Sequence, residues 1–270
     1  MSTRKTKLTA RTLLLVLQVV WIGYAQPRSS GVDLEPRRVE SDPLTVFGYL
    51  QSSLPTQIQR GYALLGFNAP LIDAQFPPLA DLRYVQLDED RELEVVLTFQ
   101  QRGVVITSIL DKQENVWWRT GQFTNGWRNL GYTDQFVEIK DVIEAGRSEL
   151  LVRRSGGGTD ISETNLVMYR LRSGRLRPVF QTREVARYRV VGSPVPGTTL
   201  ERVFLDYPDR VEAGAAILVV DRMSITSPNP PLNIDGVLRH KGNSVCEAFH
   251  WDRAKYEFVQ NASATEAFCP

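Results

Sequence analysis

Acidic side chains at alternate positions give this sequence one clear chemical possibility, which is the binding of a hard cation. The segment "DEDRELE" carries Asp88, Asp90 and Glu92 at every second position. Side chains that alternate along a tight turn can converge, and carboxylate oxygens are the ligands that calcium prefers. A weak calcium site with these three carboxylates as ligands is therefore a hypothesis for this loop.

A second loop begins in the same way but has fewer acidic groups. In "DVIEAGRSELLV", Asp141 is followed by Gly146 and then by Glu149. The glycine permits a sharp bend. The alternate positions between the two acids are Ile143 and Ala145, which have no side-chain oxygen. Because calcium takes about six to eight oxygen ligands, this loop is predicted to keep its turn without holding a metal.

The usual catalytic patterns give little support to an enzyme. The two histidines, His240 and His250, have no histidine or cysteine partner at a spacing that binds zinc. The sequence has no Gly-x-Ser-x-Gly nucleophile turn and no glycine-rich phosphate loop with its lysine. We therefore expect no catalytic residues and no cofactor. The alternative is an exported hydrolase or lyase that acts on polysaccharide with its loop carboxylates.

One aromatic segment is the best candidate for contact with a ligand. The stretch "VWWRTGQFTNGWRNLGY" holds Trp117, Trp118, Trp127 and Tyr132, with glycine and asparagine between them. Aromatic faces beside amide groups suit a sugar ring or a peptide. Trp117 and Trp118 are neighbours on an expected strand, so one of them should point inward. Packing in the core is therefore the competing explanation for the group.

Short apolar segments separated by turn residues predict an all-β fold. After residue 82, runs rich in Val, Ile, Leu, Tyr and Phe are separated by Gly, Asp, Asn and Pro, without a long helical periodicity. Before them, Pro43 follows two good capping residues and predicts one short N-terminal helix over 43–52. The segment 42–81 is interpreted either as a cap or as a divergent repeat.

The predicted strands recur as three similar units. Each unit is a hairpin with an aspartate-led turn, followed by a second hairpin, and the three turns open at Asp88, Asp141 and Asp206. Four short antiparallel strands are the content of one propeller blade. The units cover 82–123, 135–182 and 198–262, within a β-repeat domain over 82–270.

This unit resembles the FG-GAP or VCBS repeat, found in integrin α-subunit propellers and in many secreted bacterial proteins. In that family the first loop reads Asp-x-Asp-x-Asp-Gly-x-x-Asp/Glu-Leu and binds calcium. Asp141, Gly146 and Glu149 match its first, sixth and ninth positions, whereas the loop at Asp88 lacks the glycine and is two residues shorter. The resemblance implies a propeller-like fold of four-stranded units. Propellers have about four to eight blades, so three units leave ring closure open, and we expect an incomplete or stacked arrangement.

The first 25 residues have the layout of a secretory signal peptide. Four basic residues precede an apolar run from Leu13 to Ile22, and small residues lead to a cleavage point after Ala25. The apolar run is shorter than the ~20 residues that span a bilayer, so no membrane span is expected after cleavage. We therefore predict a periplasmic or secreted protein in which the polar, proline-containing segment 26–41 is a linker.

Charge and cysteine content agree with export. Loss of the four basic residues in 1–25 leaves 28 basic against 31 acidic residues. A chain so close to neutral has no strong field for nucleic acid or anionic membrane, so neither is an expected partner. Cys246 and Cys269 are predicted to form a disulfide in an oxidising compartment. The sequence thus favours an exported, non-catalytic binding or scaffolding module with a protein or glycan ligand.

Overall fold

The structure is a computed structural model of the chain. The predicted signal peptide and Trp127 lie outside the residues that it describes. Within the described residues, no helix combines the length and the apolar character needed to cross a membrane. The described residues are 32–67, 77–101, 104–125, 132–157, 161–190, 197–208, 216–229 and 243–269.

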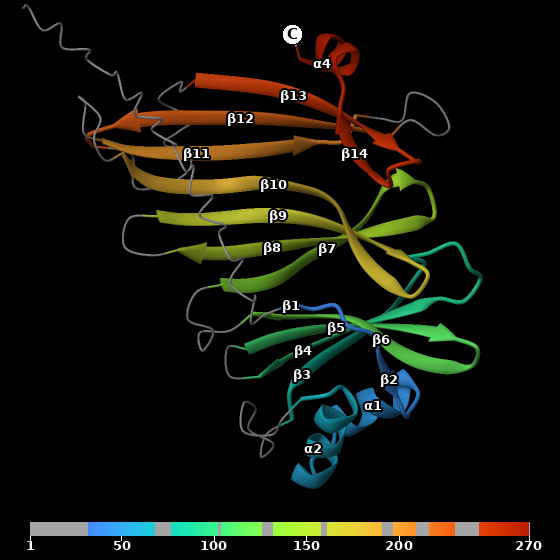
Figure 1. Cartoon of the computed structure of the whole chain (residues 1–270). Coiled ribbons are helices and arrows are strands. Elements are labelled where there is room, and N and C mark those ends of the chain that lie inside the picture. The colour runs from blue at the N-terminus through green and yellow to red at the C-terminus, as the bar shows by residue number, and fades with distance from the viewer. Residues whose placement is uncertain are drawn as a thin grey trace, which may run out of the picture.

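Most of the described chain forms two antiparallel sheets, which confirms the predicted all-β class (Figure 1). The strands are β1 (Val32–Asp33), β2 (Arg37–Val39), β3 (Leu79–Val85), β4 (Glu94–Gln101), β5 (Val104–Gln113), β6 (Val116–Asn125), β7 (Tyr132–Glu144), β8 (Arg147–Gly157), β9 (Ile161–Arg172), β10 (Arg175–Val190), β11 (Gly197–Asp206), β12 (Ile217–Ser227), β13 (Asn243–Asp252) and β14 (Glu257–Gln260). The six-stranded sheet has the order β1-β6-β5-β4-β3, with β2 also paired to β6. The eight-stranded sheet runs from β7 to β14 in chain order.

Every hairpin predicted in the three units is present. The first unit forms β3 to β6, the second forms β7 to β10, and the third forms β11 to β14. The second and third units are not separate four-stranded blades. Strand β10 pairs with β11 from Val185–Arg202 to Val190–Gly197, so the backbone hydrogen bonds continue across the boundary. The two units therefore form one continuous sheet.

The predicted N-terminal helix is α1 (Pro43–Leu50). The carboxylate of Asp42 caps it by accepting a hydrogen bond from the backbone N–H of Thr45 at 2.9 Å. Proline stands at the first helical position, where a backbone N–H group would have no acceptor within the helix, so its absence costs no hydrogen bond. Val46 and Leu50 are fully buried against the six-stranded sheet.

A second helix, α2 (Pro55–Leu64), was not predicted. Its sequence mixes polar and apolar residues and contains a glycine, and Leu54 at its start provides no side-chain cap. Packing holds it in place, because Ile58 and Tyr62 are buried in the same apolar cluster, with the Tyr62 ring 5.7 Å from that of Phe99. The segment 42–81 thus contributes two helices that lie against β3 to β6 (Figure 1).

The two sheets pack through a shared apolar cluster. Phe123 on β6 and Tyr169 on β9 lie in it, with ring centroids 5.5 Å apart. The side chain of Leu176 packs directly on Gly121, where a Cβ atom would stand 2.3 Å from it. This packing brings the turn after β3 against the turn after β7, where Ser148 N–H donates to the carbonyl of Gln86 at 2.8 Å. The acidic loops of the first two units are therefore neighbours.

The predicted disulfide between Cys246 and Cys269 is present, with 5.5 Å between the two Cα atoms. The chain reaches it through a short helix that was not predicted, α4 (Ala262–Phe268). Asn261 caps this helix by accepting a hydrogen bond from Ala264 N–H at 2.8 Å. The tail is thus tied across β13, as expected, in a helical conformation.

Removal of this bridge should lower stability measurably. We expect the double variant Cys246→Ser, Cys269→Ser to lose about 3 kcal/mol of unfolding free energy, because the unfolded chain regains the freedom of the closed loop. Urea unfolding under oxidising conditions would measure the loss. Wild-type protein in reductant serves as the control and should unfold at the same urea concentration as the variant. An unchanged midpoint in the variant would show that the bridge contributes no stability.

Candidate functional site

The first two units present turns of equal length at the junction between the sheets. In the first unit, Val85 pairs with Glu94 at the end of the β3–β4 ladder. In the second unit, the corresponding pair is Lys140 with Glu149 on β7 and β8. Both pairs enclose the same number of residues, so the two turns can be compared position by position.

A buried glutamate closes each turn in the same way. Glu94 accepts a hydrogen bond from the backbone N–H of Leu87, and Glu149 accepts one from Val142 N–H at 2.8 Å. Glu149 also accepts from Ile143 N–H at 3.2 Å. In both cases the donor lies seven residues before the glutamate. Glu94 and Glu149 are therefore structurally equivalent.

This equivalence corrects the alignment made from sequence. The sequence interpretation matched Asp88 with Asp141, whereas the structure matches Gln86 with Asp141. The first loop is therefore not two residues short. Asp88, Asp90 and Glu94 now fall at the third, fifth and ninth positions of the loop pattern quoted above. The first loop, rather than the second, keeps three of its acidic positions.

The carboxylates of Asp88, Asp90 and Glu94 converge. One oxygen atom from each lies within 4.8 Å of those of the other two. Glu92, which the sequence interpretation included, instead forms an ion pair with Lys112 at 3.0 Å. The structure thus keeps two of the three predicted ligands and replaces Glu92 by Glu94. The acids in "DEDRELE" alternate as far as Glu94, so the sequence pattern already offered Glu94 as a further candidate ligand.

A fourth carboxylate, that of Asp111 on β5, adjoins this cluster. Val95 pairs with Leu110, so Glu94 and Asp111 are the next residues along the two strands. Both are 1% exposed. Gln113 donates a hydrogen bond to one oxygen of Asp111 at 2.6 Å. The other Asp111 oxygen and one oxygen of Glu94 have no hydrogen-bond partner among the described residues.

Burial makes these carboxylates costly to ionise. Desolvation raises the pKa of Glu94 to about 8, and the negative charges of Asp88 and Asp111 add to the effect. Desolvation is also the main cause that raises the pKa of Asp111 and of Asp88. A cluster of this kind can be neutralised by protons or by a cation.

In the second unit, an arginine neutralises the equivalent glutamate. Leu150 pairs with Tyr169, so the residues next along the strands are Glu149 and Arg170, the counterparts of Glu94 and Asp111. Glu149 is 0% exposed and Arg170 is 3% exposed. Arg170 Nε lies 3.6 Å from Glu149 Oε1. Desolvation raises the pKa of Glu149 to about 7, and the charge of Arg170 opposes this rise.

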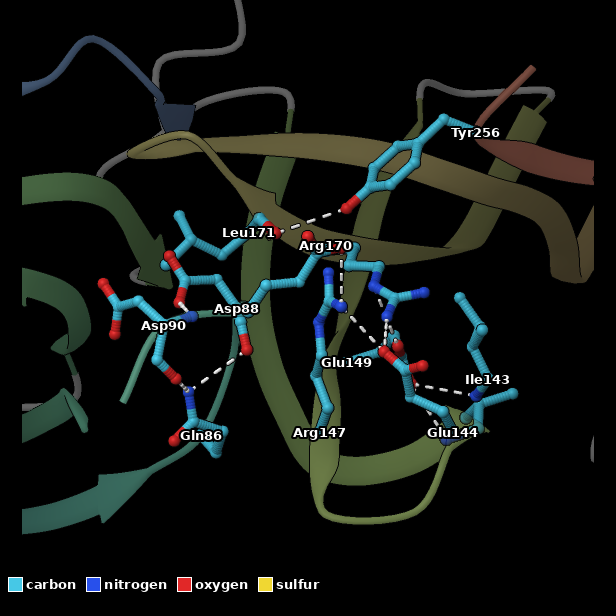
Figure 2. Close-up of polar contacts among 12 residues, drawn as sticks. Gln86, Asp88, Asp90, Ile143, Glu144, Arg147, Glu149, Arg170, Leu171 and Tyr256 are labelled. Atoms are coloured by element: carbon cyan, nitrogen blue, oxygen red, sulfur yellow. Dashed lines mark hydrogen bonds and ion pairs between the residues drawn. The ribbon is translucent and has the colours of Figure 1, made fainter. Parts of the chain in front are cut away.

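Further ion pairs surround Arg170 (Figure 2). Its guanidinium donates to Glu144, and Arg147 donates to the same carboxylate at 2.7 Å. Arg147 also reaches across the sheet junction to Glu89, at 2.9 Å. The Tyr256 ring centroid lies 5.7 Å from the Arg170 guanidinium carbon. The second loop is therefore a structural ion-pair network that joins the two sheets.

Asp141 and Gly146 keep the turn of the second loop, as predicted. Asp141 accepts hydrogen bonds from Gly146 N–H at 2.7 Å and from the Ser148 hydroxyl at 2.6 Å. Gly146 has φ of +78°, a conformation that glycine adopts without strain. Since the Asp141 carboxylate is held by its own turn and Glu149 by Arg170, their role here is structural.

The aromatic candidates are not brought together as one described surface. Trp117 is partly buried and packs on the apolar cluster beneath α1 and α2, which agrees with the core-packing explanation. Trp118, also partly buried, pairs with Arg38 on β2. Tyr132 begins β7, paired with Gly156, and Trp127 is outside the described residues.

The acidic cluster of the first loop is thus the site that the described residues define best. It joins Asp88, Asp90 and Glu94 with the buried Asp111, and three of these carboxylates have raised pKa values. Comparisons of the chain with protein-family models, with curated proteins and with solved structures find no match.

Proposed function

We propose that the protein is an exported, non-catalytic binding module of FG-GAP or VCBS-like repeats in a stacked arrangement, whose first loop binds calcium. The cation site rests on one observation. At the position where the second unit places the ion pair Glu149–Arg170, the first unit places the two buried carboxylates Glu94 and Asp111. A bound cation supplies in the first unit the positive charge that Arg170 supplies in the second.

Nearby arginine and lysine side chains are already engaged with other acids. Lys112 pairs with Glu92, and Arg147 pairs with Glu89 and Glu144. A divalent cation therefore has the three converging carboxylates of Asp88, Asp90 and Glu94 available to it, with Asp111 beside Glu94. Hard oxygen ligands in a flexible, irregular arrangement suit calcium, whereas magnesium requires a near-octahedral set.

A cation in this loop would support recognition by stiffening the junction between the sheets. The carbonyl of Gln86 accepts a hydrogen bond from Ser148 in the second loop, so a metal bound beside Gln86 constrains both units. Loops on a rigid scaffold are where binding proteins vary, which favours a protein or glycan ligand. The hydrolase or lyase alternative is less favoured, because Glu94 and Asp111 are almost fully buried and a catalytic carboxylate must reach its substrate.

Calcium should therefore raise the melting temperature of EDTA-treated protein. Binding to the native state alone, at a hundredfold excess over Kd, stabilises it by about 2.7 kcal/mol. For a chain of this size this corresponds to a rise of about 5–10 °C. Differential scanning calorimetry with added calcium, and with magnesium for comparison, would measure it.

The control variants separate a specific site from general ion effects. The double variant Glu94→Gln, Asp111→Asn should lose the calcium response, because it removes one of the three converging carboxylates and the negative charge of its buried neighbour. Asp141→Asn changes an acid in the second loop and should keep it. A melting temperature that calcium leaves unchanged in the wild type, or an equal rise in the double variant, would contradict the proposed site.

A further inference from the structure

A pocket of about 400 Å³ opens on the eight-stranded sheet and is lined by residues of β9 to β13. It lies where the apolar cluster of this sheet ends. Val203 belongs to that cluster, and Glu201, two residues earlier on β11, occupies the same face. Its lining includes Asn165, Phe180, Arg183, Glu201, Arg222 and Phe249.

The pocket contains a buried acid whose hydrogen-bonding capacity is unused. The side chain of Glu201 is 9% exposed, and its Oε1 atom has no hydrogen-bond partner among the described residues. Arg183 Nη1 and Arg222 Nε lie 3.6 Å and 3.7 Å from this oxygen. These distances allow charge attraction but are too long for hydrogen bonds. A buried acceptor of this kind is stabilised by a donor from outside the protein.

The arginines of the pocket favour a ligand that carries a carboxylate. Arg183 lies 3.7 Å from Glu163 Oε2 as well as near Glu201, so Arg222 is the less committed of the two cations. The two guanidinium groups are roughly half-exposed, so they can turn toward a ligand, and Arg222 Nε has no hydrogen-bond partner among the described residues. Arginine binds carboxylates well because its planar group presents paired donors.

The rest of the lining suits the body of a sugar ring. Phe249 is only partly buried, and its ring meets that of Phe180 edge to face at 5.3 Å. An aromatic face can pack against the C–H groups of a sugar. Asn165 on β9 adds an amide at the rim. The pocket thus combines an apolar wall, a hydrogen-bond acceptor and two cations.

We propose that this pocket binds a uronic acid, a sugar that carries both a carboxylate and hydroxyl groups. The carboxylate is held by Arg222 and Arg183, a ring hydroxyl donates to Glu201, and the ring lies against Phe249. This inference rests on the proposed function as a binding module and names its ligand class. It does not depend on the cation loop, which lies in other strands.

Titration of the full exported chain with glucuronate in EDTA-containing buffer tests the proposal, with isothermal calorimetry or NMR as the measurement. Glucuronate should bind. Glucose, which lacks the carboxylate, and acetate, which lacks the hydroxyls, should each bind about tenfold more weakly or worse. Arg222→Gln and Glu201→Ala, which removes the acceptor altogether, should each weaken glucuronate binding by about tenfold, and their far-ultraviolet circular dichroism shows whether they fold.

The matched control is Arg202→Gln. Arg202 adjoins Glu201 on β11, but its guanidinium carbon lies 5.2 Å from the Phe204 ring centroid, so its loss should leave glucuronate affinity unchanged. Absence of glucuronate binding to the wild type, equal binding of glucose or acetate, or an equal loss in Arg202→Gln would overturn the proposal. Because EDTA removes calcium, failure here leaves the calcium melting experiment as an independent test of the cation site.

Discussion

In calcium-free solution the protein is expected to lose stability as the pH rises from about 5 to about 8. Desolvation raises the pKa of Glu94 from 4.5 to about 8 and that of Glu149 from 4.5 to about 7. Between pH 4.5 and the raised pKa of each glutamate, the folded protein keeps a proton on that side chain, whereas the unfolded chain has released it. The folded state therefore binds more protons, and the unfolding free energy falls by up to about 1.4 kcal/mol per pH unit for each group.

The sign of this effect distinguishes it from ordinary acid denaturation. A carboxylate whose pKa is lowered by folding stabilises the folded state at high pH. Glu94 and Glu149 have raised pKa values, so their contribution to the unfolding free energy is fully present below pH 4.5. Their contribution is lost once the pH passes about 8 for Glu94 and about 7 for Glu149. Saturating calcium should weaken the dependence, because the cation takes the place of the proton at Glu94.

Urea unfolding at pH 5, 6, 7 and 8 in EDTA would measure the profile. Glu94→Gln should flatten it, because glutamine keeps an acceptor for Leu87 N–H but does not titrate. Glu92→Gln is the matched control two residues away, in an exposed ion pair with Lys112, and should leave the slope unchanged. A stability that is constant or rises over this pH range would show that the two glutamates are ionised in the folded protein.

Arg170→Met is expected to be among the most destabilising single changes in the described chain. The substitution removes the buried guanidinium group that faces Glu149, a side chain with 0% exposure. The same guanidinium group also pairs with Glu144. Breaking a buried ion pair by removing one partner costs about 3–5 kcal/mol, because a charge is left in the interior without compensation. The loss should be smaller at pH 5, where Glu149 can take up a proton.

Two further variants identify the cause. Arg170→Met combined with Glu149→Gln should recover part of the stability, since this combination leaves no unpaired charge beside Val142. Arg172→Met removes an exposed arginine that lies 4.4 Å from the Tyr256 ring centroid, and its effect should be within about 1 kcal/mol. Chemical denaturation at pH 7 compares them. Equal losses for Arg170→Met and Arg172→Met would show that the ion pair is not the reason.

Local residue patterns were sufficient to predict the hairpins, the first helix and the disulfide. Alternating apolar residues and turn formers predict all the hairpins of the three units, and the capping residues before Pro43 predict α1. The disulfide followed from two cysteines separated by one hairpin. These features are short-range, because strand alternation, turn geometry and helix capping each involve residues a few positions apart.

Contacts between distant parts of the chain set which side chains meet across strands and sheets. Helix α2 forms on a segment without a clear helical signal because Ile58 and Tyr62 pack on the six-stranded sheet. The continuation from β10 to β11 merges two units that the sequence kept apart. The buried pair of acids that favours a cation includes Asp111, which lies beside Glu94 only through the β4–β5 register. A one-residue change of register would place it on the opposite face, so no local pattern of residues contains this information.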